Sequence, residues 1–156
     1  MKAAFLAALA LAAGSSLEAQ TTAQSQSVDL TSVTPSPGTW SYARGADGSE
    51  ATFRNASALP QLTIRCTHSA RRVTISRPAS AAAPSLFVWT SSMARNVPAR
   101  FDPATGTASA DLAAFDATLD AISFSRGRFG VSVSGAPPFV VPAWAEPVRV
   151  IEDCRT

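Results

Sequence analysis

The sequence predicts an α+β, mostly β domain: an antiparallel β-sandwich or roll with one helix near residues 111–123 and a short C-terminal helix. Apolar and polar residues alternate in many short segments, and turns rich in Gly or Pro separate these segments. Near residues 111–123 and again at the end of the chain, the apolar residues instead follow a helical spacing. A chain of 156 residues is long enough for one hydrophobic core.

Residues 1–19 have the pattern of a signal peptide, which would direct the protein to the periplasm or outside the cell. Lys2 precedes an apolar run at 3–13, and Ala19 is a small residue of the kind that signal peptidases require. That run is about half as long as a bilayer-spanning helix, so no membrane anchor is expected after cleavage. All later basic residues are arginine, a composition that suggests a bacterial periplasm.

Residues 20–37 are rich in Gln, Ser, Thr and Pro and are predicted to form a flexible arm. The single globular domain is therefore expected to span residues 38–156. Its first strands are expected at 39–43 and 51–53, joined by a turn at 45–48.

The clearest hairpin is predicted from residues 62–66 and 73–75, where apolar residues alternate with Thr, Arg and Ser. The continuous apolar run 86–89 is typical of a strand that is buried on both faces. Residues 96–109 contain Pro and Gly at short intervals, so turns are expected there.

A helix over residues 111–123 is predicted because Asp111 is a favourable N-cap and apolar residues follow at helical spacing. A strand at 121–125 is the alternative, since apolar residues alternate there too. Further strands are expected at 129–133 and 139–141.

The C-terminal segment 144–154 is predicted to form a short helix that carries Cys154, with Pro147 in its first turn. A final edge strand is the alternative. Cys66 and Cys154 are the two cysteines of a chain that is predicted to be exported, so a disulfide is expected between them. It would close a loop of 88 residues, and loop-closure entropy gives an upper figure of roughly 4 to 5 kcal/mol for its stabilisation.

Several function classes are disfavoured by composition. The net charge of +2 is too small to indicate a nucleic-acid partner. The single histidine, His68, lies in a predicted turn, so we expect a solvated side chain rather than a general base or a metal ligand. We therefore expect no enzyme activity, no cofactor and no metal, although a hydrolase that uses only carboxylates remains a third hypothesis.

Arginine is the one residue type that suggests a binding surface. Several arginines lie on the predicted central hairpin, including Arg77, and others flank the later turn. If these strands are neighbours, they form a patch suited to carboxylate or phosphate groups. The alternative is a solvated surface neutralised by nearby acidic residues. The candidate patch consists of Arg65, Arg71, Arg72, Arg126 and Arg128.

The segment Leu62-Thr63-Ile64-Arg65-Cys66, after an early Trp40 strand and before a hairpin, resembles small exported bacterial β-sandwich proteins. These are the type VI secretion-associated VasI-like and invasion-associated locus B-like families, and a terminal cysteine after a short helix is similar to them as well. The resemblance implies a sandwich-like exported fold and an interaction role. The leading hypothesis is therefore a non-enzymatic exported protein that binds a protein or envelope component. An inhibitor of a secreted hydrolase is the second.

Overall fold

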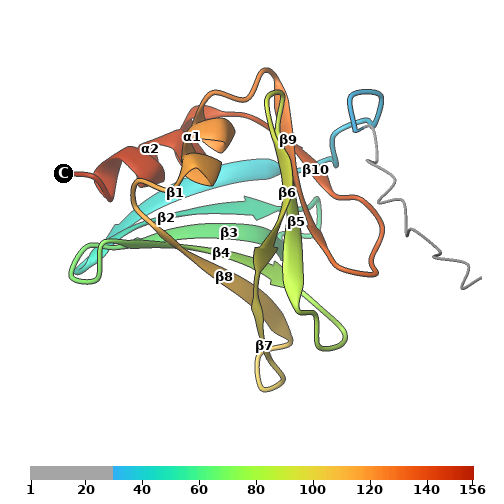
Figure 1. Cartoon of the computed structure of the whole chain (residues 1–156), viewed down its shortest axis with the longest axis horizontal. Coiled ribbons are helices and arrows are strands. Elements are labelled where there is room, and N and C mark those ends of the chain that lie inside the picture. Colours follow the sequence, from blue (N-terminus) through green and yellow to red (C-terminus); the bar gives the residue numbers. More distant parts are fainter. Residues whose placement is uncertain (1–29) are drawn as a thin grey trace, which may run out of the picture.

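The computed structural model describes residues 30–156, which form two antiparallel β-sheets and two short helices (Figure 1). The predicted fold class is therefore confirmed. The predicted signal peptide and residues 20–29 of the predicted arm lie outside the described residues. None of the helices within residues 30–156 is long and apolar enough to cross a membrane.

The larger sheet contains six strands in the order β1-β2-β3-β4-β8-β7. Its first four strands follow one another along the chain as hairpins, and β8 then pairs with β4. The predicted central hairpin is confirmed as β3 and β4, with Ile64 opposite Ile75 and Cys66 opposite Val73. The six strands are β1 (Thr39–Gly45), β2 (Gly48–Arg54), β3 (Pro60–Thr67), β4 (Arg72–Pro78), β8 (Thr107–Ala113) and β7 (Arg100–Asp102).

The smaller sheet contains four strands in the order β10-β9-β5-β6. It lies against one end of the larger sheet, and residues 94–102 run from one sheet into the other as β6 and β7 (Figure 1). Its strands are β5 (Ser85–Trp89), β6 (Ala94–Pro98), β9 (Arg128–Val133) and β10 (Val140–Pro142).

The core between the sheets follows from the alternation in the sequence, because successive side chains of a strand point to opposite faces. At the end of the larger sheet that the smaller sheet covers, an aromatic cluster fills the interior. We call this region the aromatic end; its rings belong to Trp40, Phe53, Phe129 and Phe139. The ring centroids of Trp40 and Phe53 lie 5.4 Å apart, and those of Phe53 and Phe139 lie 6.0 Å apart.

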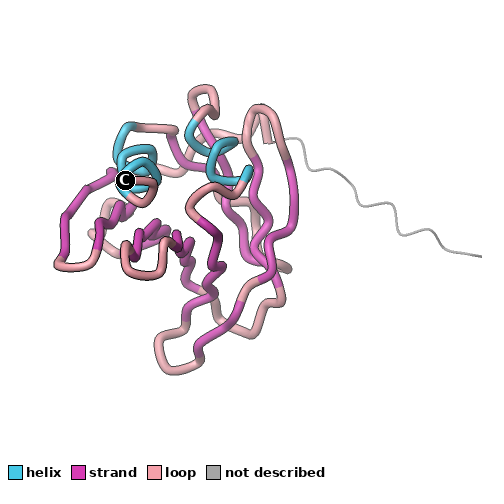
Figure 2. Tube along the Cα trace, turned by 60° about the vertical axis from the view of Figure 1, so that its left-hand side comes forward, coloured by secondary structure: helices cyan, strands magenta, loops and turns pink. Residues whose placement is uncertain are grey.

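α2 (Ala145–Asp153) covers the other end of the inner face of the larger sheet, over β1, β2 and β3, and α1 (Ala117–Ser123) packs against α2. Figure 2 shows α1 and α2 on the same side of that sheet. We call this the disulfide end; it comprises the turns at residues 45–48 and 67–72 and the C-terminal half of α2. The prediction of a C-terminal helix is confirmed, and the alternative of an edge strand is wrong.

The predicted helix near 111–123 exists, but it begins only at Ala117. Asp111 is not its N-cap; Asp116 is, and its carboxylate accepts a hydrogen bond of 2.8 Å from the Thr118 amide. Residues 107–113 form β8 instead, because Ala108, Ala110 and Leu112 alternate and face the core. Since the helix continues to Ser123, a strand at 121–125 is wrong.

Two other expectations differ from the structure. Residues 86–89 are buried on one face only: Leu86 and Val88 face the core, whereas Phe87 and Trp89 are half-buried on the outer face. The turn-rich segment 96–109 contains strands as well as turns.

Packing also begins before Gly38. Leu30 is only 1% exposed, and its side chain lies over Gly130, where a Cβ atom would meet it at 3.0 Å. The part of the predicted arm that the structure describes therefore lies against the smaller sheet.

Candidate functional site

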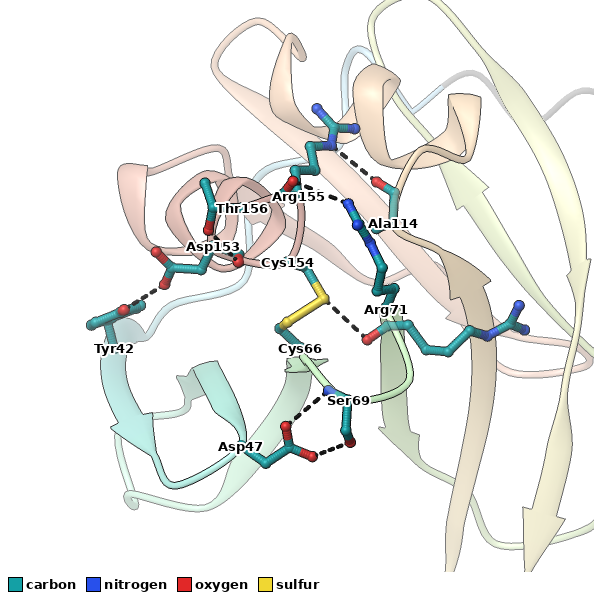
Figure 3. The surroundings of a disulfide bond; sticks show 11 residues. Tyr42, Asp47, Cys66, Ser69, Arg71, Ala114, Asp153, Cys154, Arg155 and Thr156 are labelled. Atoms are coloured by element: carbon teal, nitrogen blue, oxygen red, sulfur yellow. Dashed lines mark hydrogen bonds between the residues drawn. A yellow bond between two sulfur atoms is a disulfide. The ribbon is translucent and has the colours of Figure 1, made fainter.

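The disulfide joins the C-terminal end of β3 in the larger sheet to the C-terminal helix (Figure 3). Cys66 lies on the inner face of β3, and Cys154 is the C-cap residue of α2. Their Cα atoms are 5.4 Å apart, within the usual range for a disulfide, so the predicted pairing is confirmed. One consequence is that the chain end is fixed beside the turn that follows β3.

That turn, residues 68–71, is exposed and is held by Asp47 from the neighbouring β1–β2 turn. The backbone carbonyl of Asp47 accepts from the His68 amide at 3.2 Å, and its carboxylate accepts from the Ser69 amide at 2.9 Å. The Ser69 hydroxyl donates to the other carboxylate oxygen, as Figure 3 shows. These hydrogen bonds from Ser69 hold the pKa of Asp47 below its usual value.

Arg71 ends this turn in a left-handed backbone conformation, with a φ of 48°. Non-glycine residues rarely adopt this conformation, which costs about 1 kcal/mol. Its backbone carbonyl accepts from the Ala114 amide at 3.1 Å, and its guanidinium donates to the carbonyl of Arg155 at 3.2 Å. The side chain is thus exposed but has a defined position.

Phe115 lies between two guanidinium groups on the surface next to this turn. Its side chain is 66% exposed, and the central carbons of Arg71 and Arg155 lie 5.7 and 5.5 Å from the ring centroid. Both distances are within the range of cation–π contacts. An exposed aromatic ring with flanking arginines is the composition found at binding hot spots.

Arg155 fixes this arrangement to the two helices. Only 15% of its side chain is exposed, and it donates to the Ala114 carbonyl at 2.9 Å. Its guanidinium forms ion pairs of 2.6 Å with Asp120 and 3.0 Å with Glu152. Arg155 is therefore a structural arginine, whereas Arg71 is available to a partner.

The other hairpin arginines of the predicted patch lie on the outer face of the larger sheet. Arg72 is exposed and donates to the Asp111 carbonyl at 3.0 Å. Arg65 forms an ion pair of 2.8 Å with Glu50, as the alternative of a neutralised surface predicts for this residue. Arg71 and Arg72 are adjacent at the end of the hairpin, but Arg71 lies against Phe115 and Arg155, whereas Arg72 lies on the outer face of the sheet.

The structure does not join Arg126 and Arg128 to this group. Arg126 lies in the loop after α1, where its amide donates to the Ser91 hydroxyl at 3.2 Å. Arg128 lies on β9 of the smaller sheet and donates to the Val33 carbonyl at 2.7 Å. Arg77 faces inward at the aromatic end, 3.6 Å above the ring centroid of Phe139.

On the side of the disulfide away from the turn at 68–71, polar side chains of β1 and α2 pair with one another. The Tyr42 hydroxyl donates to Asp153, and Arg149 lies 4.2 Å from the Tyr42 ring centroid (Figure 3 shows the Tyr42–Asp153 contact). Burial raises the pKa of Asp153, but the Tyr42 hydrogen bond and the nearby Arg44 and Arg149 bring it below its usual value overall. This side of the disulfide end is therefore neutralised internally.

An open groove of about 410 Å³ runs beside the β1–β2 turn, lined by residues 43–50 and 65–67. Its carboxylates, Asp47 and Glu50, are bonded to Ser69 and Arg65. No group of three or more His, Cys, Asp or Glu side chains within residues 30–156 is arranged to hold a metal ion.

Comparisons of the chain with family models, with curated proteins and with solved structures find no match. The resemblance based on Leu62–Cys66 therefore stays a prediction.

Phe115 was not predicted as a site residue, because it is one of the apolar residues at helical spacing in the predicted helix 111–123. The alternation of Ala108, Ala110 and Leu112 was the signal for a strand that ends just before Phe115. Asp116, the N-cap in the structure, belongs to a residue type that favours this position, and a helix that begins after it leaves Phe115 outside.

Proposed function

We propose that this chain is an exported, non-enzymatic protein that binds another protein or an envelope component through Arg71, Arg72 and Phe115. The observation that carries the proposal is Arg71. It keeps an unfavourable backbone conformation while its guanidinium lies exposed against an exposed phenyl ring. Backbone strain of this kind often accompanies function, because glycine would fill the same position at lower cost.

The rigidity of the site supports binding. The turn at 68–71 is held by Asp47, by the amide of Ala114 and by the adjacent disulfide. A preorganised surface loses little conformational entropy when a partner binds, so more of the interaction energy appears as affinity.

The chemistry of the site favours a partner with carboxylate or phosphate groups next to an apolar side chain. Arginine forms bidentate hydrogen bonds with such anions, and the ring of Phe115 offers apolar area beside them. The predicted leader and the disulfide favour an oxidising compartment outside the cytoplasm, where such a partner would be met.

The proposal is tested by capture of partners from an envelope extract on immobilised protein. Arg71→Glu and Phe115→Ala should each reduce the captured partner at least about tenfold, as expected for central contacts of an interface. Arg126→Glu is the matched control, because it makes the same change of charge on an exposed arginine outside the site. Equal capture by wild type and the two site variants would contradict the proposal.

A second variant separates binding from folding. Arg71→Gly relieves the left-handed strain and should raise the free energy of unfolding by about 0.5 kcal/mol. It also removes the guanidinium, so capture should still be lost. A variant that is more stable yet binds less would show that Arg71 serves recognition, while unchanged capture would exclude it from the interface.

A further inference from the structure

Arg77 interrupts an apolar row on the inner face of the larger sheet. It follows Val73 and Ile75 on the same face of β4, and both of these side chains are fully buried. It pairs with the buried Ala108 of β8, and the register of β3 against β4 places the buried Leu62 on its other side. A charged side chain among such neighbours is rare, because burial of an unpaired charge is costly.

The guanidinium of Arg77 has hydrogen-bond donors that no acceptor satisfies. Its central carbon lies 3.6 Å from the ring centroid of Phe139, a close cation–π contact. The ring attracts the positive charge but supplies no oxygen acceptor for the N–H groups. Nε and Nη1 are buried, and neither has a hydrogen-bond partner among residues 30–156. Burial is the only cause of the lowered pKa of Arg77, so no carboxylate lies close enough to balance its charge.

Phe139 covers this guanidinium from a loop. The loop joins β9 to β10 and is exposed throughout, and the half-buried Phe139 follows it (Figure 1). The backbone of Phe139 is fixed, because its carbonyl accepts from the Val131 amide at 3.0 Å. The ring is held by packing against Phe53 and Arg77. Rotation of this side chain towards the exposed loop would uncover the guanidinium without breaking the backbone hydrogen bond.

We propose that Arg77 binds the carboxylate of a fatty acid whose apolar chain takes the place of the Phe139 ring. Arginine forms bidentate hydrogen bonds with carboxylates, and apolar surroundings strengthen them. A single guanidinium with no other charged group nearby matches the single charge of a carboxylate better than the double charge of a phosphate. The side chains of Leu62 and Phe53 provide the apolar surface that the chain of the ligand would contact.

The exchange of ring for ligand is favourable at both ends of the ligand. The free protein bears the cost of two buried donors without acceptors, and a bound carboxylate removes that cost. The apolar area that the Phe139 ring gives up against Phe53 is covered again by the chain of the ligand. Neither the carboxylate alone nor the chain alone makes both contributions, so binding should require the two together.

Isothermal titration calorimetry of the purified disulfide-bonded protein tests the ligand class. The probes are octanoate, octanol and acetate, each below the concentration at which it forms micelles or separates. The wild type should bind octanoate at one site. Octanol lacks the charge and acetate lacks the chain, so each should bind at least about tenfold more weakly than octanoate. Absence of octanoate binding, or equal binding of octanol, would overturn the proposal.

Two substitutions test the residues. Arg77→Met should weaken octanoate binding at least about tenfold and leave any octanol binding unchanged. Arg126→Met is the matched control, because it removes an exposed arginine elsewhere, and it should bind octanoate like the wild type. Phe139→Ala removes the ring that covers the guanidinium, so it should bind octanoate more tightly than the wild type. A purely structural role of Phe139 would instead weaken binding.

Circular dichroism establishes that each variant is folded. Octanoate binding by Arg77→Met at the strength of the wild type would overturn the proposal. If Arg77→Met does not fold, Phe139→Ala decides, and binding no tighter than that of the wild type overturns it. Arg71→Glu should leave octanoate binding unchanged, since the recognition site lies at the disulfide end. A failure of either proposal is thus visible without the other.

Discussion

The two ends of the larger sheet are stabilised by different kinds of interaction. At the aromatic end, four rings pack between the sheets, and Trp40 and Phe53 are no more than 4% exposed. At the disulfide end, a covalent bond and charged hydrogen bonds hold exposed groups in place, as at Asp47 and Arg155. The aromatic end stabilises the fold by burial. The disulfide end holds a surface that a partner can reach.

Two arginines show the same difference. Arg155 has an acceptor for each of its guanidinium nitrogens. At the aromatic end, Arg77 has two buried guanidinium nitrogens with no hydrogen-bond partner in the described residues, and burial lowers its pKa to about 10. The guanidinium at the disulfide end is therefore fully paired, whereas the one at the aromatic end is not.

Removal of the disulfide is the largest change that the comparison predicts. Cys66→Ser/Cys154→Ser opens an 88-residue loop and should lower the free energy of unfolding by about 4 kcal/mol. Urea denaturation of the variant and the wild type measures the difference. A loss below about 1 kcal/mol would mean that the disulfide end is held without its covalent bond.

Truncation of the aromatic cluster comes next. Phe53→Ala leaves a cavity beside Trp40 and Phe139 and should lower the free energy of unfolding by about 3 kcal/mol. Because the turn at 68–71 does not contact Phe53, partner capture by the folded variant should remain. Loss of capture in a folded Phe53→Ala protein would show that the two ends are coupled.

Substitution by methionine should change the free energy of unfolding more at Arg155, which is fully hydrogen-bonded, than at Arg77, which has buried nitrogens without acceptors. Arg155→Met leaves Asp120 and Glu152 without their partner and should cost about 2 kcal/mol. Arg77→Met removes a buried charge that lacks acceptors, so stability should change by less than about 1 kcal/mol. Thermal unfolding of both variants provides the comparison, and an equal loss would contradict it.

Acidification should have the smallest effect on the free energy of unfolding, and it should act through two carboxylates of the disulfide end. The pKa values of Asp47 and Asp153 lie below those of the unfolded chain. Their contribution to stability is therefore complete above the unfolded value of about 3.9 and is lost as the pH falls through the folded values. Denaturation midpoints between about pH 6 and pH 2 should fall less steeply for Asp47→Asn/Asp153→Asn than for the wild type. If the midpoints of the variant and the wild type fall in parallel as the pH decreases, Asp47 and Asp153 do not cause the acid dependence of stability.

Much of the fold could be predicted from local patterns. The alternation at 62–66 and 73–75 was enough to identify the central hairpin, and the presence of two cysteines in a chain predicted to be exported was enough to pair them. The start of the first helix could not be predicted, because Asp111 is locally a good N-cap. Pairing of residues 107–113 with β4 outweighs that local preference, and it is a long-range interaction.

The site was only partly predictable for the same reason. Arg71 and Arg72 were recognised from their position on the hairpin. Phe115 lies beside Arg71 because β8 pairs with β4 and Arg155 returns from the end of the chain. Contacts between residues so distant in sequence depend on topology, which the local pattern does not contain.

Amide hydrogen exchange tests most directly whether the disulfide end is held in one conformation. The informative amides are those of Ser69 and Ala114, which donate to Asp47 and Arg71, and that of Val131, which donates to Phe139 at the aromatic end. All three should be protected in the disulfide-bonded protein. In Cys66→Ser/Cys154→Ser, Ser69 and Ala114 should lose protection before Val131 does. Exchange of Ser69 and Ala114 at the rate of an unfolded chain in the intact protein would contradict the account.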